Sequence, residues 1–131
     1  MKALTINQPY ASLIADGLKW VENRTWYTGY RGRLAIHAGK GTRYLTSTEL
    51  TQYPSGIIAV CRLIACVRLG DIRHDERSVR IAFSSHTFGQ LLDHEYTEGP
   101  WCWVLDDVRK LHEPIPARGR QGLWEWTGNV S

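Results

Sequence analysis

The stretch that decides the fold reads Gln8-Pro9-Tyr10-Ala11 and then Gly17-Leu18-Lys19-Trp20-Val21-Glu22-Asn23-Arg24. A short amphipathic segment ends at a glycine, and three charged residues, Lys19, Glu22 and Arg24, follow within six residues of one another. Charges at this density beside an apolar segment indicate either a solvated surface or a binding cleft. These residues alone leave both interpretations open.

The residues around this stretch predict a short strand followed by a helix. Ala3–Ile6 is typical of a strand, Asn7 is a candidate N-cap, and Pro9 suits a first helical turn. The helix is expected to run to about Asp16, where Gly17 is well placed to end it. The chain therefore starts with a strand and one early helix.

Alternation predicts two further strands downstream. From residue 20 to 26 it places one set of side chains on a common face, namely Trp20, Glu22, Arg24 and Trp26. Lys19, in the preceding turn, is free to point toward that face. Residues 34–38 form the next strand, in which His37 lies opposite the apolar Leu34 and Ile36. A strand histidine of this kind is either a satisfied structural residue or part of a cleft wall, and both remain open.

The rest of the chain predicts mainly strands. The elements expected are a short helix over 46–53 capped by Thr46 or Ser47, a long strand over 57–69, one helical turn over 88–92 in a polar region spanning 70–100, a strand over 101–111, an extended connection through Pro114 and Pro116, and a last strand over 123–126. Five or six short strands with one early helix indicate a mixed α+β fold, a compact β-barrel, and not a doubly wound sheet.

Composition limits the function classes. The chain has 131 residues, which fits one domain over 1–131, and 43% of the residues are apolar. The net charge is +3, with twelve arginines and four lysines, which suits a polyanionic partner but also fits arginine-rich codon usage. Cys61 and Cys66 resemble small core residues, and the odd cysteine count without a leader or membrane pattern predicts a cytoplasmic protein that avoids membranes. The four other histidines show no ligand spacing, so we expect no metal and no cofactor.

Several motifs together carry a family resemblance. They are Gln8-Pro9-Tyr10-Ala11, Gly17-x-Lys19-x-x-Glu22-x-Arg24-x-Trp26, Arg31-Gly32, Ile36-His37-Ala38 and Pro114-Ile115-Pro116-x-Arg118-Gly119-x-Gln121-Gly122-Leu123-Trp124. In these residues the chain resembles the ASCH domain, a branch of the PUA-like superfamily. The resemblance implies a five- to six-stranded PUA-like β-barrel with one N-terminal helix and short accessory helices. It also implies a cleft for RNA, single-stranded nucleic acid or a modified nucleotide.

The candidate ligand-binding residues follow from the motifs and that resemblance: Gln8, Tyr10, Lys19, Glu22, Arg24, Trp26, His37, Arg118 and Gln121. Lys19 and Arg24 offer positive charge and donors to phosphate or carbonyl oxygens. Glu22 can accept from a base amino group or pair with Arg24. The tyrosine and tryptophan rings can stack on bases or belong to the core.

Enzyme activity is the alternative function. Some relatives in the family resemble hydrolases that act on acetylated cytidine, and others are associated with ribonuclease activity. In the former, a threonine nucleophile stands three residues after the lysine, where this chain has Glu22. A carboxylate can activate water but is not the same acyl-accepting hydroxyl. If the chain is an enzyme, Lys19 and Glu22 are the expected catalytic pair; otherwise it is a binding module, or a protein-interaction or regulatory domain whose cleft is vestigial.

Overall fold

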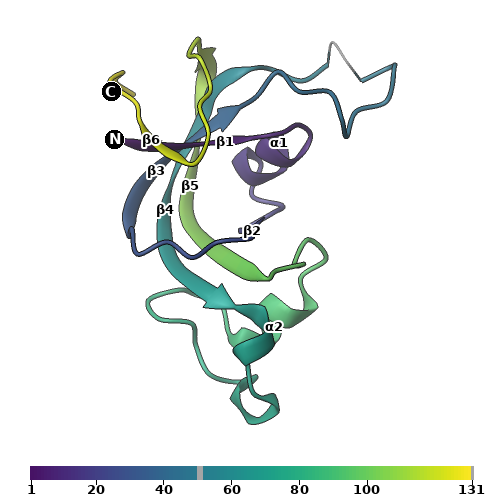
Figure 1. Cartoon of the computed structure of the whole chain (residues 1–131), viewed down its shortest axis with the longest axis vertical. Coiled ribbons are helices and arrows are strands. Elements are labelled where there is room, and N and C mark those ends of the chain that lie inside the picture. The colour runs from purple at the N-terminus through teal and green to yellow at the C-terminus, as the bar shows by residue number, and fades with distance from the viewer. Residues whose placement is uncertain (50–51, 131) are drawn as a thin grey trace. The chain divides into compact units, whose positions relative to one another are not determined.

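The computed structural model describes residues 1–49 and 52–130, and the chain forms two compact units. Unit 1 comprises Met1–Lys19, Arg33–Cys61 and Asp107–Ser131, and unit 2 comprises Trp20–Gly32 and Arg62–Asp106. The helices and strands, shown in Figure 1, are β1 (Lys2–Ile6), α1 (Tyr10–Ala15), β2 (Val21–Arg24), β3 (Gly32–Ala38), β4 (Gly56–Arg68), α2 (Phe88–Asp93), β5 (Trp101–Ile115) and β6 (Leu123–Glu125). Two short 3-10 turns, Leu69–Asp71 and His74–Glu76, follow β4.

The six strands form one mixed sheet in the order β2-β5-β4-β3-β1-β6. Within unit 1, β1 pairs in parallel with β3, which sets Thr5 beside His37, and antiparallel with β6. Within unit 2, β2 pairs antiparallel with β5, which sets Glu22 beside Trp103 and Arg24 beside Trp101. The two long strands β4 and β5 contribute residues to both units. The register of β1 on β3 decides which side chains meet at the end of unit 1.

The core of unit 1 lies on β1, β3 and the start of β4. Residues 34–38 of β3 are all buried, so both faces of this strand are covered. A cluster of apolar residues packs there: Ala3, Ala35, Ile57, Trp124 and Trp126. Trp124 and Trp126 are therefore core residues of this unit.

The core of unit 2 is a second apolar cluster, made of Val21, Ala65, Ile81, Leu91, Cys102 and Val104. α2 closes it from the polar 70–100 region and begins with a capping box, in which Thr87 Oγ1 accepts from the Gln90 backbone and Gln90 Oε1 accepts from the Thr87 backbone. The predicted helical turn over 88–92 is confirmed. Because α1 follows β1 and α2 is a second helix, the expectation of one N-terminal helix is not quite matched.

The start of the first helix differs from the prediction. α1 begins at Tyr10 with Pro9 in the N-cap position, so Asn7 is not its cap. The side chain of Gln8 takes over this role, because its Oε1 accepts from the backbone N–H of Ser12 at 2.9 Å. Gly17 does end the helix region, with a positive φ of 79°.

Three other boundaries also differ. β2 stops at Arg24, so Trp26 lies beyond the strand with which it was grouped. β5 continues through Pro114, where one edge has no partner from β2, and an open edge tolerates a residue without an N–H. Residues 46–49 form turns, so the expected helix over 46–53 is absent from them, and positions 50 and 51 of that stretch lie outside the described residues. None of the described helices is long and apolar enough to span a membrane.

Candidate functional site

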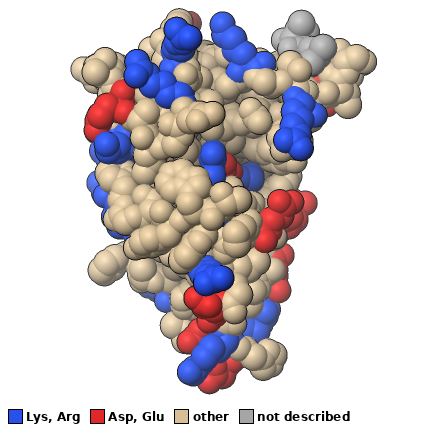
Figure 2. Space-filling model, in the orientation of Figure 1, with Lys and Arg blue, Asp and Glu red and all other residues tan. Residues whose placement is uncertain are grey.

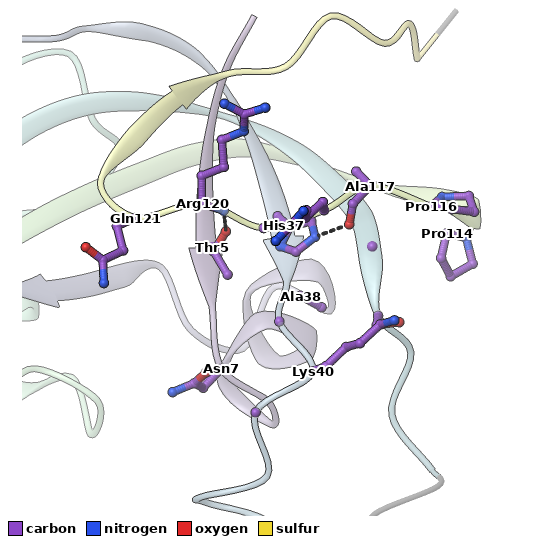
Figure 3. Close-up of a pocket in the computed structure, with 16 residues that line it drawn as sticks. Thr5, Asn7, His37, Ala38, Lys40, Pro114, Pro116, Ala117, Arg120 and Gln121 are labelled. Carbon is purple, nitrogen blue, oxygen red and sulfur yellow. Dashed lines mark hydrogen bonds between the residues drawn. The ribbon is translucent and has the colours of Figure 1, made fainter.

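A pocket of about 1040 Å³ opens in unit 1 where β1 and β3 end (Figure 3). Two loops complete it, one after β3 at residues 39–41 and one after β5 at residues 116–121. Its polar and charged lining residues are Thr5, Asn7, His37, Lys40, Ser55, Arg118, Arg120 and Gln121. The parallel pairing of β1 with β3 places Thr5 beside His37, and these two residues form part of one wall of the pocket.

His37 holds the loop after β5 against the sheet. It is 3% exposed, and its Nε2 lies 2.7 Å from the carbonyl oxygen of Ala117. Because a carbonyl only accepts, Nε2 carries the proton and donates. The ring of Trp124 packs edge-on against it, with centroids 5.6 Å apart. The buried Nδ1 hydrogen-bonds to no group within the described part of the chain.

Gly119 is the point of closest approach between that loop and the sheet. A Cβ atom at this position would lie 2.8 Å from Cε1 of His37 and 3.0 Å from Oγ1 of Thr5. The same hydroxyl accepts from the backbone N–H of Arg120 at 3.4 Å and from Nε1 of Trp124 at 3.2 Å. The loop thus sits on Thr5 and His37 because residue 119 has no side chain.

The charge of this pocket has one sign. Lys40, Arg118 and Arg120 line it and are exposed, and none of the lining residues that the structure describes carries a carboxylate. Figure 2 shows Lys and Arg side chains gathered over the part of unit 1 where β5 ends in Figure 1. A concave surface of one sign concentrates ligands of the opposite charge.

Lys19 and Tyr10 come together elsewhere in unit 1. Lys19 is only 3% exposed, and its Nζ lies 5.8 Å from the centroid of the Tyr10 ring. The rings of Tyr10 and Tyr44 pack in a T-shaped arrangement with their centroids 5.2 Å apart. The guanidinium carbon of Arg43 lies 5.3 Å from the centroid of the Tyr44 ring. A lysine over an aromatic face is an attractive arrangement whose strength rises as water is excluded.

Glu22 and Arg24 form an ion pair on β2 of unit 2. Nη2 of Arg24 donates to Oε2 of Glu22 at 2.9 Å, and the side chains of Arg24 and Glu22 are 23% and 10% exposed, respectively. The expected pairing of these two residues is confirmed, because neighbours two apart on a strand share one face. This contact fixes the direction of the guanidinium.

The remaining predicted residues differ in how far contacts within the protein already occupy their side chains. Gln8 is 2% exposed, and its Nε2 donates to Ser12 and to the carbonyl of Pro54, so this amide holds α1 to a neighbouring loop. Trp26 is 37% exposed and packs edge-on against Trp103 at 4.8 Å. The face of Trp20, a second ring considered for stacking, is covered by His86 at 3.7 Å.

The sequence-predicted residues therefore fall into separate groups. His37, Arg118 and Gln121 share the pocket, Lys19 accompanies Tyr10, and Glu22 accompanies Arg24. The pocket residues missing from the prediction are Thr5, Asn7, Lys40 and Arg120. Lys40 could have been found from the sequence, because Gly39-Lys40-Gly41 places a lysine between two glycines directly after the strand of His37.

The cysteines carry no signs of nucleophilic chemistry. Burial raises the pKa of Cys61 to about 12 and that of Cys102 to about 11. Desolvation also raises the pKa of the half-buried Cys66. Since the thiolate is the reactive form, these three environments all disfavour catalysis by cysteine.

The chain belongs to the ASCH domain family, whose model matches residues 4–115. It is similar to "Activating signal cointegrator 1" of Homo sapiens, with 25% identity over 139 residues, and of Mus musculus, with 31% identity over 134 residues. These alignments cover 97% and 84% of this chain but only 22% and 23% of the relatives. The chain thus spans less than a quarter of the length of these two relatives.

A solved structure supports the same fold. The crystal structure of a mutant of the ZmASCH protein from Zymomonas mobilis matches with a TM-score of 0.53 and 21% identity, covering 96% of this chain and 90% of that chain. The likeness supports a mixed α/β fold built on a barrel-like sheet. The loop over His37, residues 117–121, lies beyond the segment that the family model matches.

Proposed function

We propose that this chain is a binding module for nucleic acid or a modified nucleotide, with RNA as the favoured partner, and that Lys19, Glu22 and Arg24 contact the ligand. One observation carries the proposal: two of the three charged residues of the motif are buried. Lys19 is 3% exposed and Glu22 is 8% exposed. Lysine and glutamate are almost never fully buried unless they are paired, and a solvated surface does not bury them. Burial therefore favours the binding-cleft interpretation.

The chemistry of these groups suits a nucleotide. The guanidinium of Arg24 is oriented by Glu22 at 2.9 Å, and a guanidinium is suited to bonding phosphate or base oxygens. Glu22 can accept from an exocyclic amino group. The half-exposed ring of Trp26 offers a stacking surface, and such a stack contributes about 1–3 kcal/mol in single-strand binders. The association with RNA comes from the family.

The test is a binding titration with a labelled single-stranded RNA, followed by fluorescence anisotropy. We expect the affinity to fall steeply with salt, because phosphate contacts release counterions. The variants Arg24→Gln and Trp26→Ala should each weaken binding about tenfold. Lys110→Gln, which replaces an exposed lysine paired with Asp16, is the matched control. Absence of binding to RNA and single-stranded DNA, or unchanged affinity in both variants, contradicts the proposal.

The same preparation tests the hydrolase alternative. Wild-type protein and Glu22→Gln are incubated with RNA and, separately, with acetylcytidine, and products are followed by chromatography. If the wild type converts either substrate and Glu22→Gln does not, the chain is a hydrolase in which this carboxylate acts as a base, and the binding-module proposal is wrong.

A further inference from the structure

We infer that the pocket around His37 is a binding site for a phosphate monoester, in which Lys40, Arg118 and Arg120 hold the phosphate. The inference goes beyond the proposed function and does not rest on it, because Lys19, Glu22 and Arg24 are not among the residues that line this pocket. Four observations within unit 1 carry it: uncompensated charge, a preformed loop, a buried nitrogen on the wall, and size.

The first observation is uncompensated positive charge. Three carboxylates of unit 1 pair with other cations, in the ion pairs Lys2–Glu125, Lys110–Asp16 and Arg109–Asp107. Within the described part of the chain, Lys40, Arg118 and Arg120 take part in no ion pair. Three like charges around one pocket repel each other, and a dianion that enters it removes this repulsion.

The second observation is that the cationic loop is already held in place. The carbonyl of Ala117 accepts from His37, and Gly119 lies against the ring of that histidine. The backbone of Arg120 donates to Thr5. Since the loop carrying both arginines is held at three points, it loses little conformational freedom when a ligand binds.

The third observation is the free ring nitrogen of His37. Nδ1 is buried on the pocket wall and hydrogen-bonds to no group that the structure describes, although buried polar atoms nearly always have a partner. Nε2 already donates to Ala117, so Nδ1 is an acceptor in the neutral ring and a donor in the imidazolium. It lies close to Gly119 of the loop that carries the arginines, so an unsatisfied polar group backs this side of the pocket.

The fourth observation is size. A pocket of about 1040 Å³ lies at the upper end of small-molecule sites and is far larger than a phosphate group needs. Figure 3 shows Asn7 and Gln121 on the side of the pocket away from Pro114 and Pro116. Their amides both donate and accept, which suits a sugar or base edge. The ligand class is therefore a nucleoside monophosphate, either free or as the phosphorylated end of an RNA.

The experiment compares ligands that differ only in the phosphate. Isothermal titration calorimetry is run with uridine 5′-monophosphate and uridine, and with a short RNA bearing either a 5′-phosphate or a 5′-hydroxyl. We expect at least one phosphorylated ligand to bind about tenfold more tightly than its unphosphorylated counterpart. The double variant Arg118→Gln/Arg120→Gln should abolish this preference, while Arg109→Gln, which replaces an exposed arginine of the same unit, should keep it.

Gly119→Ala provides a variant that leaves all charges in place. A Cβ there must displace the loop from His37, so the phosphate preference should fall in this variant but not in Gly70→Ala, where a Cβ meets no atom within 4 Å. A preference for the phosphorylated RNA over the free nucleotide assigns the site to a nucleic-acid end, and similar affinities assign it to a nucleotide.

The results separate this inference from the proposed function. Equal affinities with and without phosphate in both ligand pairs, or a preference that survives loss of both arginines, overturn the inference even if RNA binds through Arg24. Phosphate-dependent binding of the mononucleotide that Arg24→Gln leaves unchanged, without any affinity for RNA or single-stranded DNA, supports the inference and contradicts the proposed function.

Discussion

The motif that follows α1 and the pocket around His37 both concentrate positive charge, but they do so in opposite ways. Lys19 and Glu22 are buried, and Glu22 is bonded to Arg24. Arg118 and Arg120, in contrast, are exposed and form no ion pair within the described residues. Buried paired charges support the folded structure in addition to any ligand contact they make, whereas exposed uncompensated charges are available to a ligand without such a structural role.

This contrast has a consequence for mutagenesis. A substitution in the motif changes the free energy of unfolding together with any ligand affinity, so lost binding there has two explanations. A substitution of the exposed pocket cations is expected to leave the fold intact, so lost binding there has one explanation. The contrast can be tested by measuring stability first, beginning where the largest change is expected.

Glu22→Gln should give the largest loss of stability. Removing one member of a buried ion pair costs about 3 kcal/mol, because the guanidinium of Arg24 loses the carboxylate that offsets its desolvation. Urea denaturation followed by tryptophan fluorescence measures the change in the free energy of unfolding. Glu98→Gln, which replaces an exposed carboxylate of the same unit, should change it by less than about 0.5 kcal/mol. Equal stability of the two variants would show that the Glu22–Arg24 pair does not support the fold, and the motif would then no longer differ from the pocket in this respect.

The sequence could predict the local part of this arrangement. Alternation located β1, β2, β3 and the last strand, and a glycine after an apolar turn marked the end of α1, because these signals depend only on neighbouring residues. The pairing of Glu22 with Arg24 followed from the period of a strand.

The pocket could be predicted only in fragments. His37 and Ala117 are 80 positions apart, and their contact depends on the register of β1 on β3 and on the path of a loop after β5. Neither the strand register nor the path of the loop can be predicted from a pattern of neighbouring residues. Lys40 and Asn7 were missed for the same reason, since Asn7 had a plausible local role as a helix cap that the side chain of Gln8 fills instead.

Thr5→Val should give an intermediate loss in the free energy of unfolding. This variant tests whether Thr5 supports the wall of the pocket, in contrast to the exposed cations that would bind a ligand. Valine cannot accept from Nε1 of the buried Trp124, and an unsatisfied buried donor costs about 1–3 kcal/mol. The same denaturation measurement applies, with the exposed Thr127→Val as the matched control. A loss below about 0.5 kcal/mol, the size expected for the control, would show that Thr5 does not support the wall.

Gly119→Ala should give a smaller loss, of about 1 kcal/mol, because overpacking is relieved when the exposed loop moves. The ring of His37 cannot yield easily, since it is buried and bonded to Ala117. We therefore expect the loop to shift and the nuclear magnetic resonance signals of His37 and Trp124 to move. Unchanged signals for both rings would mean that the loop does not rest on His37 in solution.

Arg118→Gln/Arg120→Gln should give the smallest change in the absence of ligand, below about 0.5 kcal/mol, because both side chains are exposed and neither has an ion-pair partner to lose. The contrast with Glu22→Gln becomes sharpest when a phosphorylated ligand is added. A ligand at about a hundred times its dissociation constant stabilises the folded state by about 2.7 kcal/mol, so whichever phosphorylated ligand binds in the calorimetric comparison should, at saturation, raise the melting temperature of the wild type. The double variant should show no such rise while melting at the wild-type temperature without ligand. A double variant that melts well below the wild type before any ligand is added would show that these arginines support the fold, and the two regions would then differ in exposure but not in role.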